Sequence, residues 1–379
     1  MPIGINLNLS IGPNNPRPAP DWMIEAVDKI QVTQSVDGKS GFQITLMAGR
    51  SSSGEFGDDK LLSSDLLNPF NRVILTVTFG AIARVLMDGI ITRQEFTPSL
   101  EPGSSILTIT GEDVSVMMDL EEKSVEHPGL SDQDIVNQII SQYSQYGLTP
   151  KVSSPPIQDR PPITERIPVQ QGSDLEYIKY LAERYAFLFY IIPGPTSGTN
   201  SAYWGPPQLS GSSQKALTVN MGSFSNVEKI NLQINALAPT KVTGRVQDRK
   251  TNQIQSVSSN SSTRNPLSQE PALTNQRHLR TTQFRETGRL QSQGNSRAQG
   301  MLNRSVDKVI TVTGTLSITD YGDILTCGKT VDLRGVGYTY DGRYFVNSVT
   351  HSLQDGRYMQ DFILTREGLG TTIQQVAAV

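Results

Sequence analysis

The chain has 379 residues, of which 36% are hydrophobic, so it is long enough to bury two or three hydrophobic cores. Its 32 glycines and 22 prolines favour many short strands joined by turns over a helical bundle. The single cysteine, Cys327, excludes an internal disulfide, and no stretch approaches the roughly 20 apolar residues of a membrane-spanning helix. Residues 1–20 lack the basic start and apolar core of an export signal, so we expect synthesis and assembly in the cytoplasm.

The net charge of −3 conceals an uneven distribution of charged residues. Up to residue 130 acidic residues outnumber basic ones by about eight, and between residues 241 and 308 basic residues are in excess by about as many. These basic residues are diluted by Ser, Asn, Gln and Thr and are not interleaved with aromatic residues. The pattern therefore favours a solvated loop or a protein-docking surface over a nucleic-acid site.

The N-terminal third predicts an arm followed by a small β-barrel. Residues 1–20 are rich in Pro and Asn and show no periodicity, so we expect an extended N-terminal arm that orders only on a partner. Alternating apolar and polar residues then predict strands at residues 29–33, 42–46, 73–79, 84–96 and 106–110. With Gly and Pro turns between them, these strands predict a first β-barrel domain over residues 21–114.

Residues 115–200 predict an α+β helical insertion domain. Ser131 is an N-cap candidate for a helix that carries Ile135 and Ile139 on one face and ends by Gly147. A second helix begins after Ser173, which forms a capping box with Glu176, and a strand is expected at residues 187–192. The apolar stripe of this second helix consists of Leu175, Ile178, Leu181, Ala182 and Tyr185.

The remaining sequence predicts a second β-barrel domain, formed by residues 201–250 and 306–368. Its strands are expected at residues 216–220, 227–234, 241–247, 309–318, 330–333, 344–349 and 360–365. Residues 251–305 form a polar basic insertion, a long loop with one helix at residues 288–304, and residues 369–379 form a C-terminal tail. The fold class is therefore mainly β with α+β insertions: two similar small β-barrel domains with a helix-containing α+β domain between them.

The most specific motif is a β-hairpin near the C-terminal end. Its two strands carry buried-face candidates at alternating positions, and Gln354-Asp355-Gly356 supplies the turn. These candidates are Tyr344, Val346, Val349, Tyr358, Phe362 and Leu364. The order Asp-Gly-x-Tyr-x-Val-x-x-Val-x-His from Asp341, followed by Phe-x-Leu-x-Arg, resembles the C-terminal signature of the phage late control D family. The helix within residues 171–187 resembles the helix of the same family, although Tyr185-Ala186 stands where the family often has His-Gly.

This resemblance implies the baseplate hub of a contractile phage tail or a related contractile injection system, with a tail-tube-like fold. Such a hub is a homotrimeric ring that adapts the sixfold tail tube to the threefold spike around a central channel. The implied partners are a tail tube or tube-initiator protein, a spike protein and other baseplate or wedge proteins. DNA would pass through the channel without specific binding, and the implied location is the tail baseplate of the virion, assembled in the host cytoplasm.

A faint internal repeat agrees with this family. Asp88-Gly89 leads into a strand and then to residues 106–110, much as Asp341-Gly342 leads through Tyr344 to residues 362–365. Two similar barrels per subunit would let a trimer present six near-equivalent units, and such a duplication leaves this kind of repeat. We further expect the acidic residues of the first barrel to line the channel, and residues 1–20 and 251–300 to contact other baseplate proteins.

The sequence contains no recognisable set of catalytic residues. His127, His278 and His351 are well separated and are not paired with Cys or closely spaced carboxylates, so we expect no metal site and no cofactor site. Asp58-Asp59 and Glu121-Glu122 are acid and base candidates for cell-wall hydrolysis, but neighbouring carboxylates in polar segments are usually solvated. We therefore expect a structural protein and not an enzyme. Two alternatives remain: a peptidoglycan-hydrolysing or carbohydrate-binding tail component, and a secretion-system spike, which is less favoured because only 13 residues follow Arg366.

Overall fold

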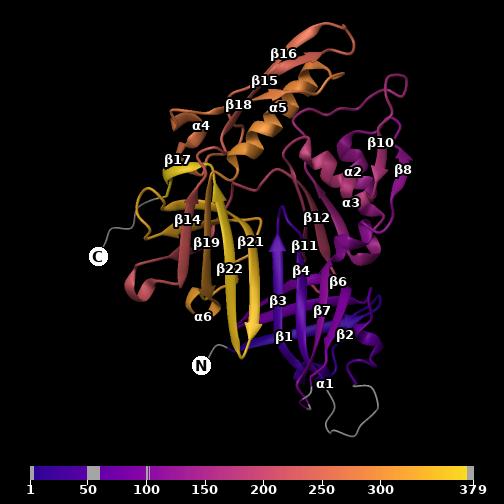
Figure 1. The fold of residues 1–379 in the computed structure, drawn as a ribbon, viewed down its shortest axis with the longest axis vertical. Helices are drawn as coiled ribbons and strands as arrows, with labels where there is room; N and C mark the ends of the chain where they lie inside the picture. Colours follow the sequence, from indigo (N-terminus) through magenta and orange to yellow (C-terminus); the bar gives the residue numbers. More distant parts are fainter. Residues whose placement is uncertain (1–3, 49–59, 100, 102, 374–379) are drawn as a thin grey trace.

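The computed structural model describes all residues except 1–3, 49–59, 100, 102 and 374–379. Most strands belong to one 13-stranded sheet that extends through two β units (Figure 1). The first β unit contains β1 (Ile5–Gly12), β2 (Arg17–Pro18), α1 (Asp21–Glu25), β3 (Val27–Ser35), β4 (Gly41–Ala48), η1 (Asp65–Leu67), β5 (Arg72–Phe79), β6 (Ile82–Thr97), β7 (Ser105–Asp113) and η2 (Val114–Met118). The second β unit contains β13 (Gln214–Thr218), η4 (Gly222–Phe224), β14 (Lys229–Ile234), β19 (Ile310–Ser317), α6 (Ile318–Tyr321), β20 (Thr330–Arg334), β21 (Gly342–Gln354) and β22 (Arg357–Arg366).

The strand order of this sheet is β14-β19-β22-β21-β3-β4-β7-β6-β5-β1-β2, and all neighbours along this path are antiparallel. The mainly β, antiparallel fold class is confirmed. The described residues contain no closed barrel, which is where the structure differs from the two barrels expected. The difference arises at β21, whose first residues pair with β20 and whose residues from Ser348 onward pair with β3. The sheet of the second unit therefore continues into the first unit instead of closing on itself.

The C-terminal hairpin has the faces predicted from its alternation. Tyr344, Val346, Val349, Tyr358, Phe362 and Leu364 are all at most 1% exposed. The turn lies at Asp355 and Gly356, both of which adopt positive φ. Most of these side chains pack into the core of the second unit, whereas Tyr358 packs into the core of the first unit. The hairpin thus joins the two cores.

The N-terminal segment differs from the free arm that we predicted. β1 pairs with β5 along its whole length, from Ile5 opposite Phe79 to Gly12 opposite Arg72. Leu9 and Ile11 are each 2% exposed and belong to the core of the first unit. The described part of this segment is therefore a strand of the first unit, held by hydrophobic burial and a backbone ladder.

The helical insertion, at the right in Figure 1, contains the two predicted helices and the predicted strand, together with four strands that were not predicted. It contains β8 (Lys123–Glu126), α2 (Asp132–Ser141), η3 (Ser144–Tyr146), β9 (Leu148–Val152), β10 (Val169–Gly172), α3 (Asp174–Glu183), β11 (Leu188–Pro193) and β12 (Asn200–Gly205). Both helices begin after the serines that the sequence predicts as N-caps, Ser131 and Ser173, and each serine forms a capping box, which the sequence predicted only for Ser173. Their apolar faces pack with the sheet β11-β12-β9 around the buried Trp204.

The basic insertion, at the top of Figure 1, has more structure than the long loop that we predicted. It contains β15 (Thr240–Gln247), β16 (Ile254–Ser259), β17 (Ser268–Pro271), α4 (Ala272–Asn275), β18 (Arg280–Phe284) and α5 (Gln291–Val306). The sheet β16-β15-β18 packs against α5, which confirms the predicted helix, and β17 pairs with β23 (Gly368–Thr371). β15, expected in the second barrel, belongs to this sheet. The segment orders because Val242, Val246 and Phe284 are buried with Ala298 and Leu302, in the same hydrophobic core as the second β unit.

Candidate functional site

The three histidines lie in separate parts of the fold. His127 is buried in the helical insertion beside Gln170 and stacks on Tyr177, and His278 is exposed between α4 and β18. His351 is fully buried on β21, where its Nδ1 lies 2.8 Å from the Tyr358 hydroxyl. Burial lowers the pKa of His351 to about 3, so its imidazole is neutral at physiological pH. Among the described residues, no group of His, Cys, Asp and Glu side chains could hold a metal ion.

The carboxylate pairs proposed as acid and base form no site in the described structure. Asp58 and Asp59 lie outside the described residues. Glu121 and Glu122 are both exposed, as neighbouring carboxylates in a polar segment usually are. Burial raises the pKa of the Cys327 thiol to about 12, so this cysteine is not a reactive thiolate at neutral pH.

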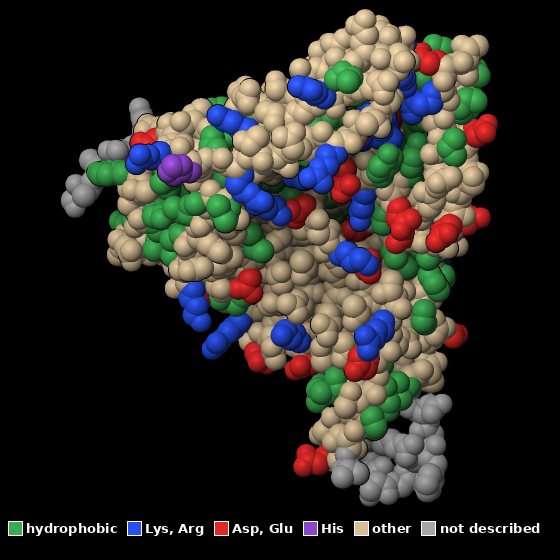
Figure 2. All heavy atoms as spheres, turned by 45° about the horizontal axis from the view of Figure 1, so that its top comes forward, with side chains coloured by type: hydrophobic (Ala, Val, Ile, Leu, Met, Phe, Trp, Pro, Cys, Tyr) green, Lys and Arg blue, Asp and Glu red, His purple; other side chains and the backbone are tan. Residues whose placement is uncertain are grey.

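Several cations of the basic insertion are held in ion pairs. Arg249 lies 2.8 Å from Glu165, and Arg289 and Arg297 lie 3.3 Å and 2.9 Å from Glu286. Burial lowers the pKa of Arg297, and the nearby Arg184 lowers it further. On the face drawn in Figure 2, Lys and Arg side chains are scattered among acidic and neutral ones and do not form one basic patch. This arrangement agrees with a protein-docking surface and offers little to a nucleic-acid backbone.

One face of the central sheet carries mostly small polar side chains, and we call it the outer sheet face. Its side chains alternate with the buried ones along β19, β22, β21, β3, β4 and β7. It consists mainly of Thr311, Thr313, Thr315, Met359, Asp361, Ile363, Ser348, Thr350, Ser352, Gln31, Thr33, Gln43, Thr45, Ile106, Thr108 and Thr110. Asp361 is the one acid among these residues, and its carboxylate accepts a 2.6 Å hydrogen bond from Thr315. Lys29, Glu112 and Arg357 occupy further positions of the same alternation towards the strand ends, so the outer sheet face is polar and carries few charges.

This face is continuous across the boundary between the two β units. The Thr33 and Thr350 hydroxyls hydrogen bond at 3.1 Å where β3 meets β21. Between β14 and β21 the face is hollowed into an open groove of about 360 Å³, bordered by Lys229, Thr313 and Asp361. Hydroxyl and amide groups can contact a polymer that moves along this face without binding it strongly, because each net hydrogen bond in water contributes only about 1 kcal/mol.

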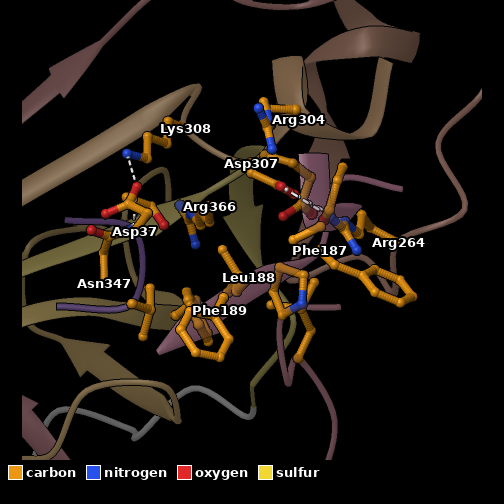
Figure 3. A pocket seen from close by; sticks show the side chains of 18 of the residues that line it. Asp37, Phe187, Leu188, Phe189, Arg264, Arg304, Asp307, Lys308, Asn347 and Arg366 are labelled. Atoms are coloured by element: carbon orange, nitrogen blue, oxygen red, sulfur yellow. Dashed lines mark hydrogen bonds and ion pairs between the residues drawn. The ribbon is translucent and has the colours of Figure 1, made fainter. Parts of the chain in front are cut away.

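A cavity of about 390 Å³ lies where the two β units and both insertions meet (Figure 3). Phe187, Leu188 and Phe189 of the helical insertion form its apolar side together with Phe345 and Leu267. Its charged groups come from every part of the chain. They form the pairs Asp37 with Lys308, Arg264 with Asp307 at 3.1 Å, and Arg304 with Glu183 at 3.5 Å.

Two groups of this cavity are fixed particularly well. Burial raises the pKa of the Asp307 carboxyl, while two hydrogen bonds from Arg264 oppose that shift. Arg366 is 1% exposed, stacks 4.3 Å from the Tyr344 ring and donates to the carbonyls of Asp341 and Thr339 at 3.0 Å and 2.9 Å. These contacts make the cavity a structural junction between the parts of the chain.

A buried polar cluster attaches the helical insertion to the first β unit. Arg72 donates to both carboxylate oxygens of Asp88, at 2.7 Å and 2.6 Å, and to the Tyr146 carbonyl at 2.8 Å. Asn200 donates to Asp88 at 2.8 Å and to the same Tyr146 carbonyl at 3.0 Å. We did not predict this cluster from the sequence. The available signal was an arginine and an aspartate in strands whose other residues are mostly apolar.

The comparisons with known proteins agree with this architecture. The family model described as the Alg8 N-terminal domain matches residues 23–355. The chain belongs to the Alg8 N-terminal domain family. No curated protein sequence matches it significantly. The described residues contain no helix that is long and apolar enough to cross a membrane.

Solved structures show that members of this fold include phage tail proteins. The tail protein from Neisseria meningitidis MC58 is 13% identical with a TM-score of 0.61, over 97% of this chain and 98% of that one. The 43 kDa tail protein of prophage MuSo2 from Shewanella oneidensis is 13% identical with a TM-score of 0.62, over 96% and 99% of the two chains. The Escherichia coli c3393 protein, described as a component of the type VI secretion system, is 10% identical with a TM-score of 0.54, over 90% and 73%. The chain therefore has the fold of these tail proteins.

Proposed function

We propose that this protein is a structural hub subunit of a contractile phage tail baseplate. In this proposal three copies form a ring around a central channel and join the sixfold tail tube to the threefold spike. The observation that carries the proposal is the division of the central sheet into two halves with matching strand order, β3-β4-β7-β6 and β14-β19-β22-β21. Two similar halves in each of three copies make six near-equivalent units, which suits a sixfold tube above a threefold spike.

The outer sheet face supports the channel role. It has few charges, so a polyanionic cargo such as DNA would meet neither an attractive basic wall nor a strongly repulsive acidic one. The uncharged hydroxyl and amide lining takes the place of the acidic wall that the charge distribution suggested. We propose that this face lines the channel and that DNA passes it without specific binding.

The domain organisation and the partners follow from the same proposal. Residues 21–114 would form one similar unit of each subunit, and residues 201–250 and 306–368 would contribute to the other, with residues 115–200 and 251–305 as insertions and residues 369–379 as a tail. The helical and basic insertions would face the other baseplate or wedge proteins. The tail tube or its initiator and the spike would contact opposite ends of the ring, within a virion baseplate assembled in the host cytoplasm. The resemblance to the late control D family supports these assignments.

The proposal is that the protein is architectural and not an enzyme. The acidic side chains at the junction cavity lie in ion pairs or accept backbone hydrogen bonds, as Glu367 does from Leu267 and Ser268 at 2.7 Å and 2.8 Å. Such carboxylates are poorly placed for acid–base chemistry on a polysaccharide. A zymogram on peptidoglycan tests the alternative of a cell-wall hydrolase directly: a cleared band would contradict the architectural proposal.

Native mass spectrometry of the purified full chain tests the ring. We expect a species with the mass of three chains, and negative-stain images should show a ring with a central opening. A protein that stays monomeric at all concentrations would contradict the proposed function. A trimer whose natural polypeptide also contains a spike domain would favour a secretion-system spike over a phage hub.

A further inference from the structure

The two halves of the central sheet end in equivalent strands. β6 and β21 are each followed by a hairpin partner, β7 and β22, and an Asp-Gly pair stands inside β6 at Asp88-Gly89 and at the start of β21 at Asp341-Gly342. Each of these long strands is interrupted against its partner by one irregularity, between Ile91 and Arg93 in β6 and between Val346 and Ser348 in β21. Bulges of this kind re-aim a strand, so both strands leave their own half in the same manner.

The halves differ in what lies along the strand beyond the bulge. β21 pairs there with β3, from Ser348 opposite Ser35 to Gln354 opposite Lys29. β6 pairs with β7 on one edge from Arg93 to Thr97, and no described strand pairs with its other edge. Residues 92–97 are exposed on both faces of the strand. The opposite end of the sheet is also open, because β14 pairs only with β19 among the described strands.

We propose that the free edge of β6 pairs with the free edge of β14 in a second copy of this chain, repeating between copies the β21–β3 pairing made within one copy. This inference rests on the proposed ring and names the surfaces that would close it. Unpaired strand edges are templates for further strand pairing. Because one chain carries both edges, the contact is head to tail, and such contacts generate rings when the rotation closes.

Strand direction agrees with this pairing. Eight strands lie between the two edges, counting β14 and β6, and neighbours alternate in direction throughout. Since eight is even, β6 of one copy and β14 of the next run in opposite directions. The new ladder is therefore antiparallel, like every other pair along the path.

The internal repeat also predicts the register. Aligning the two bulges makes Arg93 in β6 the counterpart of Ser348 in β21. Paired residues are then followed across each half, from β6 through β7 and β4 to β3, and from β21 through β22 and β19 to β14. This makes Ile230 the counterpart of Ile30. Carrying over the observed β21–β3 pairs gives the expected pairs between copies: Glu95 opposite Gln233, Phe96 opposite Leu232, and Thr97 opposite Asn231.

The side chains of the two edges are compatible in this register. Phe96 is 41% exposed and pairs within its own chain with the buried Leu107, so it lies on the core side of the sheet. Leu232 and Ile234 lie on the core side of β14, and Ile234 is 40% exposed. Pairing would cover these apolar groups, while the polar Glu95, Thr97, Asn231 and Gln233 would continue the outer sheet face into the next copy.

Disulfide trapping tests the contact in the full-length protein. Thr97→Cys combined with Asn231→Cys, and Glu95→Cys combined with Gln233→Cys, place two thiols directly opposite each other, within the Cα separation that a disulfide needs. All four positions are exposed, and the native Cys327 has a pKa raised to about 12, so it does not compete. We expect mild oxidation to give covalently linked dimers and trimers, and no larger species, for at least one double variant. The four single variants should give no linked species.

The outcomes separate this inference from the proposed function. A native trimer in which neither double variant forms covalently linked chains would overturn the β6–β14 contact and leave the ring intact. Cross-linking of a single variant to itself would show a two-fold contact and overturn the head-to-tail arrangement. A largest linked species with a number of chains other than three would support the contact and contradict the threefold ring.

A second variant tests the apolar part of the contact. Phe96→Asp should leave the thermal unfolding of the monomer within a few degrees of the parent, because Phe96 is exposed in one copy, yet should weaken self-association at least tenfold in sedimentation. Leu120→Asp is the matched control, since Leu120 is 54% exposed and lies between η2 and β8, in neither strand of the proposed contact. Equal association of both variants with the parent would overturn the proposal.

Discussion

The second β unit and the helical insertion are attached to the first β unit in physically different ways. The second unit is attached through the backbone ladder between β21 and β3, whose hydrogen bonds come from groups that every residue except proline possesses. The helical insertion is attached through the side chains of Arg72, Asp88 and Asn200, all of which are buried. A ladder tolerates many side-chain changes as long as the core beneath it is filled, whereas a buried polar cluster depends on each of its members.

The largest effect should come from emptying the core beneath the ladder. Phe362 is 1% exposed and packs in the core of the second unit, so Phe362→Ala should cost about 3–5 kcal/mol of unfolding free energy and prevent assembly. Chemical denaturation measures the loss. The neighbouring Ile363→Ala is the control, because Ile363 is 38% exposed on the outer sheet face. Similar losses for both variants would mean that the two faces of β22 are assigned incorrectly.

Removing one charge from the polar cluster should have a slightly smaller effect. Asp88→Asn preserves the shape of the side chain but leaves the buried Arg72 guanidinium without its counter-ion, at a cost of about 3 kcal/mol. Hydrogen exchange should then show faster opening of β9 and β12 than of β21. The control is Glu95→Gln, because the Arg93–Glu95 pair is exposed and worth at most about 1 kcal/mol. Uniform loss of protection over the whole chain would contradict a local attachment role.

The smallest effect at neutral pH concerns His351, because it develops only as the pH falls. Because the pKa of His351 is lowered to about 3 in the folded protein, the unfolded chain binds this proton more readily between about pH 6.5 and pH 3. The stabilisation that depends on the neutral imidazole is complete above about pH 6.5 and decreases as the pH falls through this window. His351→Gln should therefore flatten the dependence of stability on pH in that range, and an unchanged slope would show that other groups cause it.

Local elements were predictable wherever a short segment contained a helix cap or a clear hydrophobic alternation. α2 and α3 begin at Ser131 and Ser173 because each serine caps the helix and is followed by an acidic residue three positions later. The hairpin faces followed from strict alternation. β1 was missed although Leu7, Leu9 and Ile11 alternate strictly with polar residues, because the Pro and Asn content of residues 1–20 was given more weight than this short alternation. The strands of the basic insertion were missed because few apolar residues mark them.

The buried polar contacts were not predictable in the same way. Arg72 and Asn200 are 128 positions apart in the sequence, and their meeting at Asp88 depends on how β12 docks against β6. The ion pair of Arg264 and Asp307 likewise joins the loop between β16 and β17 to the end of α5. Nothing local in the sequence distinguishes these side chains from solvated ones, because their burial is a property of the assembled fold.

The sequence by itself determined the mainly β class, the two capped helices and the buried face of the β21–β22 hairpin, since hydrophobic periodicity and capping act over a few residues. Only the tertiary structure decided that β21 passes from β20 to β3, so that the two units share one open sheet instead of closing into two barrels. The physical reason is that the hydrogen-bonding groups of a strand edge are the same for almost every residue. The choice of edge partner is therefore made by the packing of distant cores and not by the strand's own side chains.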